Sequence, residues 1–87
     1  MKVYITISED FESGEEKILG VFKRYEKARN SCIDNANLAT VNTDKYVELD
    51  HEREGEYLAV GVYQPMYDNE KPEVTRRYFV ITKQVVD

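Results

Sequence analysis

Only one stretch of this chain repeats its apolar residues at helical spacing, and the other apolar stretches have the pattern of strands. Within residues 23–38, Tyr25, Ala28, Cys32 and Ala36 recur at intervals of three and four, which predicts a helix with one narrow apolar stripe. A single helix can cover only one face of a sheet. The sequence therefore predicts a sheet with one covered face and one open face.

Five segments are predicted to be strands. Residues 2–8 alternate strictly between aliphatic and other side chains, which is typical of a half-buried strand. The remaining strands are expected at 17–22, 45–50, 56–64 and 73–86. The order is therefore ββαβββ. We expect an α+β fold in which a mainly antiparallel sheet carries one helix packed on one face, in a single domain over residues 1–87.

Length and composition fit a small globular domain. The chain has 87 residues, of which 41% are hydrophobic and 33% charged. One cysteine, Cys32, excludes an internal disulfide and fits a reducing compartment. No apolar stretch approaches the roughly 20 residues needed to span a bilayer, and the N-terminus lacks the apolar region of a signal peptide. We expect a cytoplasmic protein with no membrane-spanning segment.

Alternation within the strands assigns their side chains to the two faces. One parity is aliphatic and is the face that we expect the helix to cover: Val3, Ile5, Ile7, Leu19, Val21, Val47, Leu49, Leu58, Val60, Val62, Phe79 and Ile81. The other parity adds Thr6 and Phe22 to six candidates for a protein interface: Tyr4, Tyr46, Tyr57, Tyr63, Tyr78 and Arg76. Tyrosine and arginine are enriched in interface cores. The alternative is that tyrosines simply suit strand surfaces.

Acidic residues are concentrated in two segments. The net charge is −5, and residues 9–16 and 48–56 hold ten of the seventeen acidic side chains. The candidates for acidic contact with a partner are Glu9, Asp10, Glu12, Glu15, Glu16, Glu52 and Glu54. Negative charge argues against general binding to phosphate backbones. Because an acidic surface can imitate nucleic acid electrostatically, DNA mimicry is a subsidiary hypothesis.

The segment "ELDHEREGEY", residues 48–57, contains the only histidine, His51, among alternating acids. A metal site needs several ligands that converge on one point, whereas alternate residues of a strand lie nearly 7 Å apart. The acidic segment 9–16 is the only other contributor, and we expect it at the opposite end of the sheet. We therefore predict no catalytic residue, metal or cofactor, and interpret the segment as a hairpin turn.

Two loop lengths keep the hairpin faces consistent. The preferred one is a four-residue loop, 52–55, with Gly55 at positive φ. It sets His51 opposite Glu56, Leu49 opposite Leu58 and Val47 opposite Val60. The alternative is a two-residue turn at Glu54 and Gly55, which pairs Arg53 with Glu56 but asks Glu54 to adopt positive φ.

Three stretches resemble small uncharacterised proteins of bacteriophages and prophages. They are "KVYITI", "LGVFKRYEKA" and the terminal "YFVITKQVVD". The resemblance brings no activity with it. It implies a genomic setting in which compact acidic proteins bind and inhibit a host or defence protein.

These observations favour a non-enzymatic module of phage or prophage origin that binds a host or defence protein through the tyrosine-rich face or an acidic end. A homodimer contact is a second arrangement that the same face suits. The first alternative is a single-stranded nucleic-acid-binding domain that uses Tyr4, Tyr57, Tyr78, Arg76 and Arg77. The less favoured alternative is a metal-dependent hydrolase that uses His51 and nearby acids.

Overall fold

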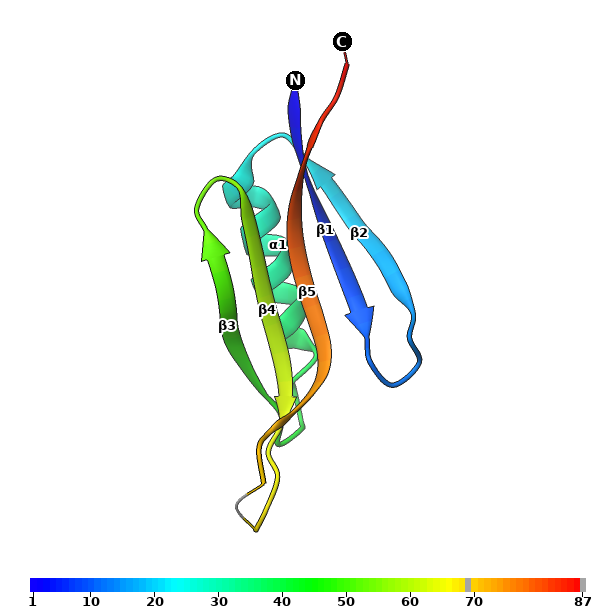
Figure 1. Cartoon of the computed structure of the whole chain (residues 1–87), viewed down its shortest axis with the longest axis vertical. Helices are drawn as coiled ribbons and strands as arrows, with labels where there is room; N and C mark the ends of the chain where they lie inside the picture. Colours follow the sequence, from blue (N-terminus) through cyan, green and yellow to red (C-terminus); the bar gives the residue numbers. More distant parts are fainter. Residues whose placement is uncertain (69, 87) are drawn as a thin grey trace.

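Five strands and one helix form the fold in a computed structural model of the chain, which describes residues 1–68 and 70–86 (Figure 1). The elements are β1 (Lys2–Asp10), β2 (Glu16–Phe22), α1 (Tyr25–Leu38), β3 (Tyr46–Arg53), β4 (Tyr57–Gln64) and β5 (Glu73–Gln84). The predicted ββαβββ order and the α+β class are confirmed.

The five strands form one sheet in the order β2-β1-β5-β4-β3, and every neighbouring pair is antiparallel. The first and last strands of the chain lie side by side at the centre, with Ile5 opposite Ile81. The β1–β2 hairpin supplies one edge of the sheet and β3 supplies the other. The β1–β2 turn and the β3–β4 turn lie at opposite ends, as the sequence predicts (Figure 1).

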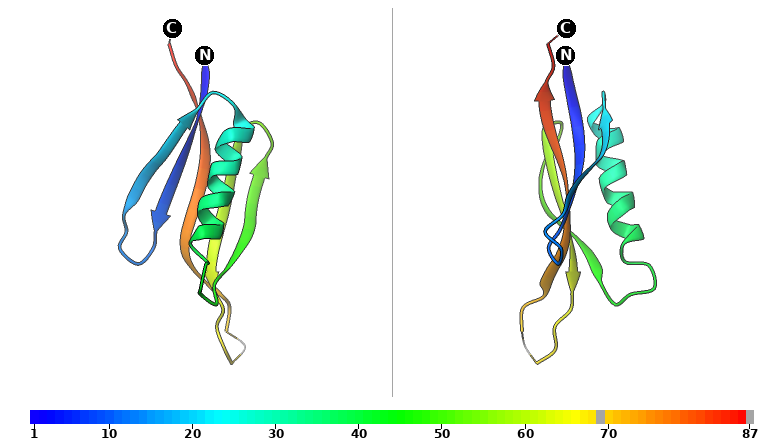
Figure 2. Two further views of the ribbon diagram at one scale, coloured as in Figure 1. Left: turned by 180° about the vertical axis from the view of Figure 1, so that it is seen from behind. Right: turned by 90° about the vertical axis from the view of Figure 1, so that its right-hand side faces the viewer.

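The helix lies on one face of the sheet only (Figure 2), and it contacts the central strands β1 and β5 most extensively. It begins at Tyr25, after Arg24 in an extended conformation that makes no side-chain capping hydrogen bond. This agrees with the poor N-cap in the sequence. No helix in the described part of the chain is long and apolar enough to cross a membrane.

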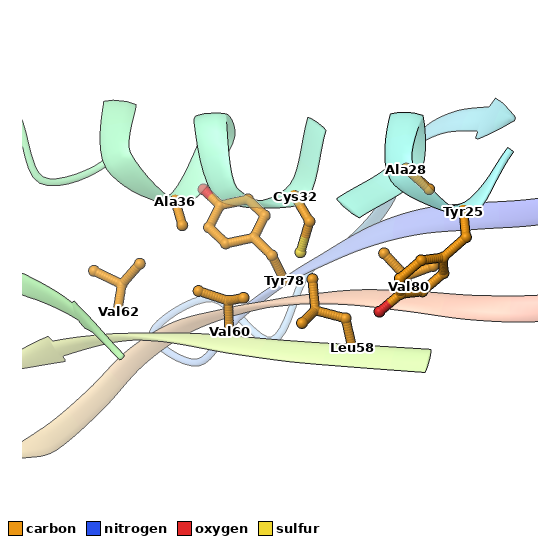
Figure 3. Close-up of a cluster of buried hydrophobic side chains, with 9 residues drawn as sticks. All are labelled: Tyr25, Ala28, Cys32, Ala36, Leu58, Val60, Val62, Tyr78 and Val80. Atoms are coloured by element: carbon orange, nitrogen blue, oxygen red, sulfur yellow. The ribbon is translucent and has the colours of Figure 1, made fainter. Parts of the chain in front are cut away.

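The core lies between α1 and the middle of the sheet (Figure 3). Small helix residues let the backbone approach closely, while larger side chains from β4 and β5 fill the space beneath. The buried cluster consists of Tyr25, Ala28, Cys32, Ala36, Leu58, Val60, Val62, Tyr78 and Val80. Thr6 is also fully buried, and its hydroxyl donates to the carbonyl of Ala28 at 3.3 Å. A polar residue is thus accommodated under the helix because its hydrogen bond is made.

The predicted grouping of aliphatic residues on one face is correct for β3 and β4 and wrong for the other three strands. Val47 and Leu58 lie on the helix side, as expected. In β1 and β5, however, Thr6 and Val80 face the helix and lie opposite each other. The residues that therefore point to the open side are Val3, Ile5, Ile7, Phe79 and Ile81, together with Val21 of β2. Alternation fixes which residues of one strand share a face, whereas the register between strands decides which face is covered.

Candidate interaction surface

The face of the sheet opposite α1, called here the open face, has an apolar half. Two rows of opposed residues cross β2, β1 and β5 there. The rows are Val21–Ile5–Ile81 and Ile18–Ile7–Phe79, and we call these six residues the apolar patch. Ile18 is 68% exposed, Val21 60% and Ile81 42%. An apolar cluster of this kind, open to solvent, marks an interaction surface more often than isolated exposed side chains do.

The other half of the open face, on β3 and β4, is aromatic and polar. Tyr46 and Tyr63 lie opposite each other and stack, with ring centroids 5.7 Å apart. The Tyr63 hydroxyl donates to Asp50 Oδ1 at 2.6 Å. Arg77 Nε lies 3.4 Å from Asp50 Oδ2, and its guanidinium lies 5.5 Å from the ring centre of Phe11. This network connects the edge strand β3 to the central strand β5 across the open face.

Gly61 makes that network sterically feasible. It lies on β4 opposite both Glu48 and Arg77. A Cβ atom there would lie 2.5 Å from the Tyr63 ring and 2.6 Å from Asp50 Oδ2. The hydrogen bond between Tyr63 and Asp50 raises the pKa of the Tyr63 hydroxyl, because loss of the proton would place two negative charges together.

His51 occupies the outer edge of the same half. Its ring stacks on Tyr57 with centroids 5.0 Å apart, and its Nε2 atom lies 2.8 Å from the Tyr57 hydroxyl. The predicted position of His51 beside Glu56 is wrong, because His51 lies opposite Ala59. The histidine is thus part of an exposed aromatic pair rather than a charge-paired strand end.

The predicted hairpin register is wrong because β3 continues to Arg53, beyond the expected end of the strand, and because Asp50 forms a β-bulge. Leu49 lies opposite Val60 rather than Leu58, in the register that a two-residue turn implies. Asp50 is then an extra residue, and beyond it Arg53 pairs with Tyr57. The added residue lets Gly55 alone adopt positive φ, at 82°, while Glu54 does not. The prediction of positive φ at Gly55 is confirmed.

Glu52, predicted to contact a partner, instead points to the helix side. Its carboxylate accepts from Arg29 Nε at 2.7 Å and from the Tyr25 hydroxyl at 2.8 Å. The hydrogen bonds from Arg29 and Tyr25 lower the pKa of the Glu52 carboxyl. Burial, followed by the bond to Glu52, raises the pKa of the Tyr25 hydroxyl. Glu52 therefore anchors β3 to α1.

The acidic residues of the β1–β2 turn divide into structural and exposed ones. Asp10 accepts hydrogen bonds from the backbone N–H groups of Glu12 and Ser13 and forms an ion pair with Arg76 at 2.9 Å. The bond from the Glu12 N–H is the main cause of its lowered pKa. Glu9 lies directly opposite Glu16, and their side-chain interaction raises the pKa of Glu9. Like charges in direct opposition destabilise a strand pair.

The six predicted interface residues do not share one face. Tyr46, Tyr57 and Tyr63 lie on the open face. Tyr78 is 4% exposed beneath the helix, and Tyr4 packs edge-to-face on Tyr25 with centroids 5.7 Å apart. Arg76 lies on the helix side of β5, opposite Val62. The prediction of one tyrosine-rich face is therefore wrong as geometry, because β1 and β5 turn their tyrosines toward the helix.

Metal and nucleophile chemistry find little support in the arrangement. Among residues 1–68 and 70–86, no group of three or more His, Cys, Asp or Glu side chains is placed to hold a metal ion. Cys32 is buried beneath the helix, and loss of hydration raises the pKa of its thiol to about 12. A thiol of this kind is not activated as a nucleophile at neutral pH.

Sequence reasoning missed the apolar patch and the cluster of Asp50, Tyr63 and Arg77. One signal for the cluster was present, since a glycine inside a strand often marks close approach of another group. Gly61 within "LAVGVY" is such a glycine. The patch had no comparable signal, because the alternation in β1 marks Ile5 and Ile7 as residues to be buried beneath the helix, whereas they lie on the open side.

Comparisons with protein-family models, with curated proteins and with solved structures gave no match.

Proposed function

We propose that this protein is a non-enzymatic binding module whose binding site is the open face of the sheet. The observation that carries the proposal is the apolar patch, which no helix or loop among the described residues covers (Figure 2). The patch lies on three adjacent strands, so its shape is held by the hydrogen-bonded sheet. A preformed apolar surface of this kind binds with little loss of conformational entropy.

Charge around the patch indicates the chemistry of the partner. Glu9 and Glu16 lie at one end of the open face, and Glu48 borders its polar half. The chain as a whole carries a net charge of −5. A protein that presents apolar side chains surrounded by Lys and Arg would complement this surface, because opposite charges at the rim steer association.

The phage-type resemblance gives this partner a biological class. We propose a host or defence protein as the partner and the host cytoplasm as the compartment. The two acidic segments lie at opposite ends of the sheet and do not form one continuous acidic surface (Figure 1). We therefore favour binding through the open face over DNA mimicry. The residues proposed for single-stranded nucleic acid are divided between the two faces, with Tyr4 and Tyr78 under the helix. That division makes nucleic acid the weaker alternative.

The test uses a charge placed inside the patch. The full chain and an Ile81→Glu variant serve as baits in the native host, and each captured protein is then produced and its Kd measured directly. Leu38→Glu is the matched control, because Leu38 is 70% exposed at the end of α1 and away from the patch. Tyr78→Ala is unsuitable, since Tyr78 belongs to the core.

We expect a purified partner to bind the parent and Leu38→Glu equally, and Ile81→Glu at least about tenfold more weakly, since a charge buried in an apolar contact costs more than 1.4 kcal/mol. Equal affinity of all three baits would overturn the open-face proposal. Binding of an oligonucleotide that weakens steeply with salt, without a protein partner, would favour the nucleic-acid alternative instead.

A further inference from the structure

The edge strand β2 exposes three aliphatic side chains and carries little charge. Ile18 is 68% exposed, Leu19 38% and Val21 60%. Within β2, the charged residues are Glu16 and Lys17, both at its beginning, and the rest of the strand is "ILGVF". An edge strand also presents backbone N–H and C=O groups that no neighbour uses. β2 therefore offers hydrogen bonds and apolar surface together.

The opposite edge is protected against pairing. β3 has the sequence "YVELDHER", with acidic or basic side chains at Glu48, Asp50, Glu52 and Arg53. Charged residues along an edge strand prevent the addition of another strand. Both edges contain a bulge, so the bulges do not account for the difference. The contrast is one of charge, and it leaves β2 as the edge that accepts a partner strand.

The charges that flank β2 select the partner. Glu15 and Glu16 lie at its beginning, and Lys23 and Arg24 follow its end. A second copy of β2 that runs antiparallel, with the two-fold axis between Leu19 and Gly20, sets the acidic end of each strand beside the basic end of the other. This register sets Ile18 opposite Val21, both open-face residues, and Glu16 opposite Lys23. Opposite charges in such cross-strand positions stabilise the pair.

We propose that β2 pairs antiparallel with β2 of a second copy of this chain, about a two-fold axis near Leu19 and Gly20. A two-fold axis perpendicular to the sheet makes the contact self-complementary and closed, as in most homodimers. It joins the two sheets into one and keeps both open faces on the same side. The apolar rows then continue across the dimer, through Ile18 and Val21 of each copy.

The exposed surface of the isolated chain is consistent with an uncovered edge. The molecule measures 53 × 25 × 20 Å and exposes 5981 Å². A folded monomer of this mass typically exposes about 5,300 Å². The proposal does not depend on a host partner, because it concerns the edge of the sheet, whereas partner binding concerns the open face.

The first experiment measures self-association of the full chain. Sedimentation equilibrium over a wide concentration range should give a monomer–dimer equilibrium. Ile18→Lys should weaken it about tenfold or more, because the substitution occurs twice in the dimer and places each charge within the apolar rows at the contact. Leu38→Lys is the control, with similar exposure, at 70%, on a surface away from β2. Circular dichroism of both variants checks that they fold.

The second experiment reverses the charges at the ends of β2. A Glu15→Lys/Glu16→Lys variant has basic residues at both ends, and a Lys23→Glu/Arg24→Glu variant has acidic residues at both ends. Each alone should dimerise about tenfold more weakly than the parent, whereas an equimolar mixture should form a heterodimer. The control mixture makes the same changes in total charge away from β2, with Glu54→Lys/Glu70→Lys and Lys27→Glu/Lys71→Glu. Each control variant should dimerise as the parent does, so mixing the two should leave the total amount of dimer unchanged.

Three results would overturn self-pairing. They are a monomer at every concentration, a dimer that Ile18→Lys leaves intact, and a charge-reversed mixture that associates no better than either of its two variants alone. Hydrogen exchange that protects β2 amides only after a different protein is added would assign the edge to that protein. Ile81→Glu should leave the dimer intact, so loss of partner binding and loss of dimerisation are measured separately.

Discussion

The two edge strands of the sheet, β2 and β3, have similar lengths but differ in how their side chains contact the rest of the molecule. β3 is fastened to the rest of the molecule by polar contacts on both faces: Glu52 to Arg29 and Tyr25 on the helix side, and Asp50 to Tyr63 and Arg77 on the open side. Among the described residues, no such polar contact joins β2 to the rest of the molecule from Ile18 to Val21, where its exposed side chains are aliphatic. Charge on an edge strand can therefore attach that strand and also discourage further pairing.

The largest difference between the two sides of the sheet is expected when one methyl group is added to a glycine on each side, at Gly61 beside β3 and at Gly20 of β2. In Gly61→Ala, the new Cβ would meet Asp50 and a Tyr63 ring that is held by its hydrogen bond. We expect a loss of about 1–3 kcal/mol in the free energy of unfolding. In Gly20→Ala, it would meet only the Phe22 ring, at 2.8 Å, on a half-buried side chain that can rotate.

Gly20→Ala should therefore cost less than about 1 kcal/mol. Urea unfolding of both variants measures the difference. Equal losses in the free energy of unfolding would show that the surroundings of Gly61 and Gly20 are equally constrained.

The anchor between β3 and the helix gives the next largest effect. Glu52→Gln removes the charge that accepts from Arg29 and should cost about 1–2 kcal/mol near neutral pH. The pKa of Glu52 is lowered in the folded state, so this stabilisation is present above the ordinary value of 4.5 and is lost as the pH falls through the folded pKa. The parent and the variant should therefore converge in acid.

Chemical unfolding at several pH values measures this difference. Glu54→Gln, at an exposed position of the same turn, is the control and should change little. A Glu52→Gln penalty that stays constant down to low pH would mean that the ion pair is not its source.

A valine on each edge provides a smaller contrast. Val47 of β3 packs against the core, so Val47→Ala should cost about 1 kcal/mol. Val21 of β2 is 60% exposed, so Val21→Ala should cost less than about 0.5 kcal/mol. Thermal unfolding at dilute concentration, where the chain is monomeric, compares them. Equal costs would imply that β2 is covered by something other than solvent.

The smallest effect concerns the opposed acids at the base of β2. Glu16→Gln should raise the stability near neutral pH, because it removes the like charge opposite Glu9. The pKa of Glu9 is raised in the folded state, so the penalty is complete above that folded pKa. It disappears as the pH falls to the ordinary value of 4.5.

Melting temperatures at neutral and acidic pH test this sign. Glu12→Gln makes the same change of charge in the turn, without a carboxylate directly opposite in the strand ladder, and is the control. A gain from Glu16→Gln that persists in acid would contradict the assignment to Glu9.

Local features of this protein were predictable from its sequence. The helix stripe, the ββαβββ order of the elements along the chain and the positive φ of Gly55 each depend on a few neighbouring residues and on steric rules that act within a turn or a hairpin. The register of β3 on β4 was not predicted: Asp50 forms a bulge, and its carboxylate lies against Arg77 of a strand distant in the sequence, which residue spacing does not reveal.

The predicted acidic contact residues also divide into those whose surroundings were predictable and those that bind distant residues. Glu12, Glu15, Glu16 and Glu54 are exposed, as expected of acidic contact residues. Glu52 and Asp10 are engaged in ion pairs with Arg29 and Arg76. Both partners come from distant segments, so spacing alone gave no sign of either pair.

The sequence by itself determined the elements, their order and the fact that one helix must leave one face of the sheet uncovered. Only the tertiary structure decided which face that is. In β1 the aliphatic parity faces away from the helix and Thr6 is buried with its hydrogen bond made, so apolar character alone did not assign the face. The choice depends on shape and register: the small residues of α1 fit over Tyr78 and Val80, and Ile5, Ile7 and Phe79 are thereby turned to the other side.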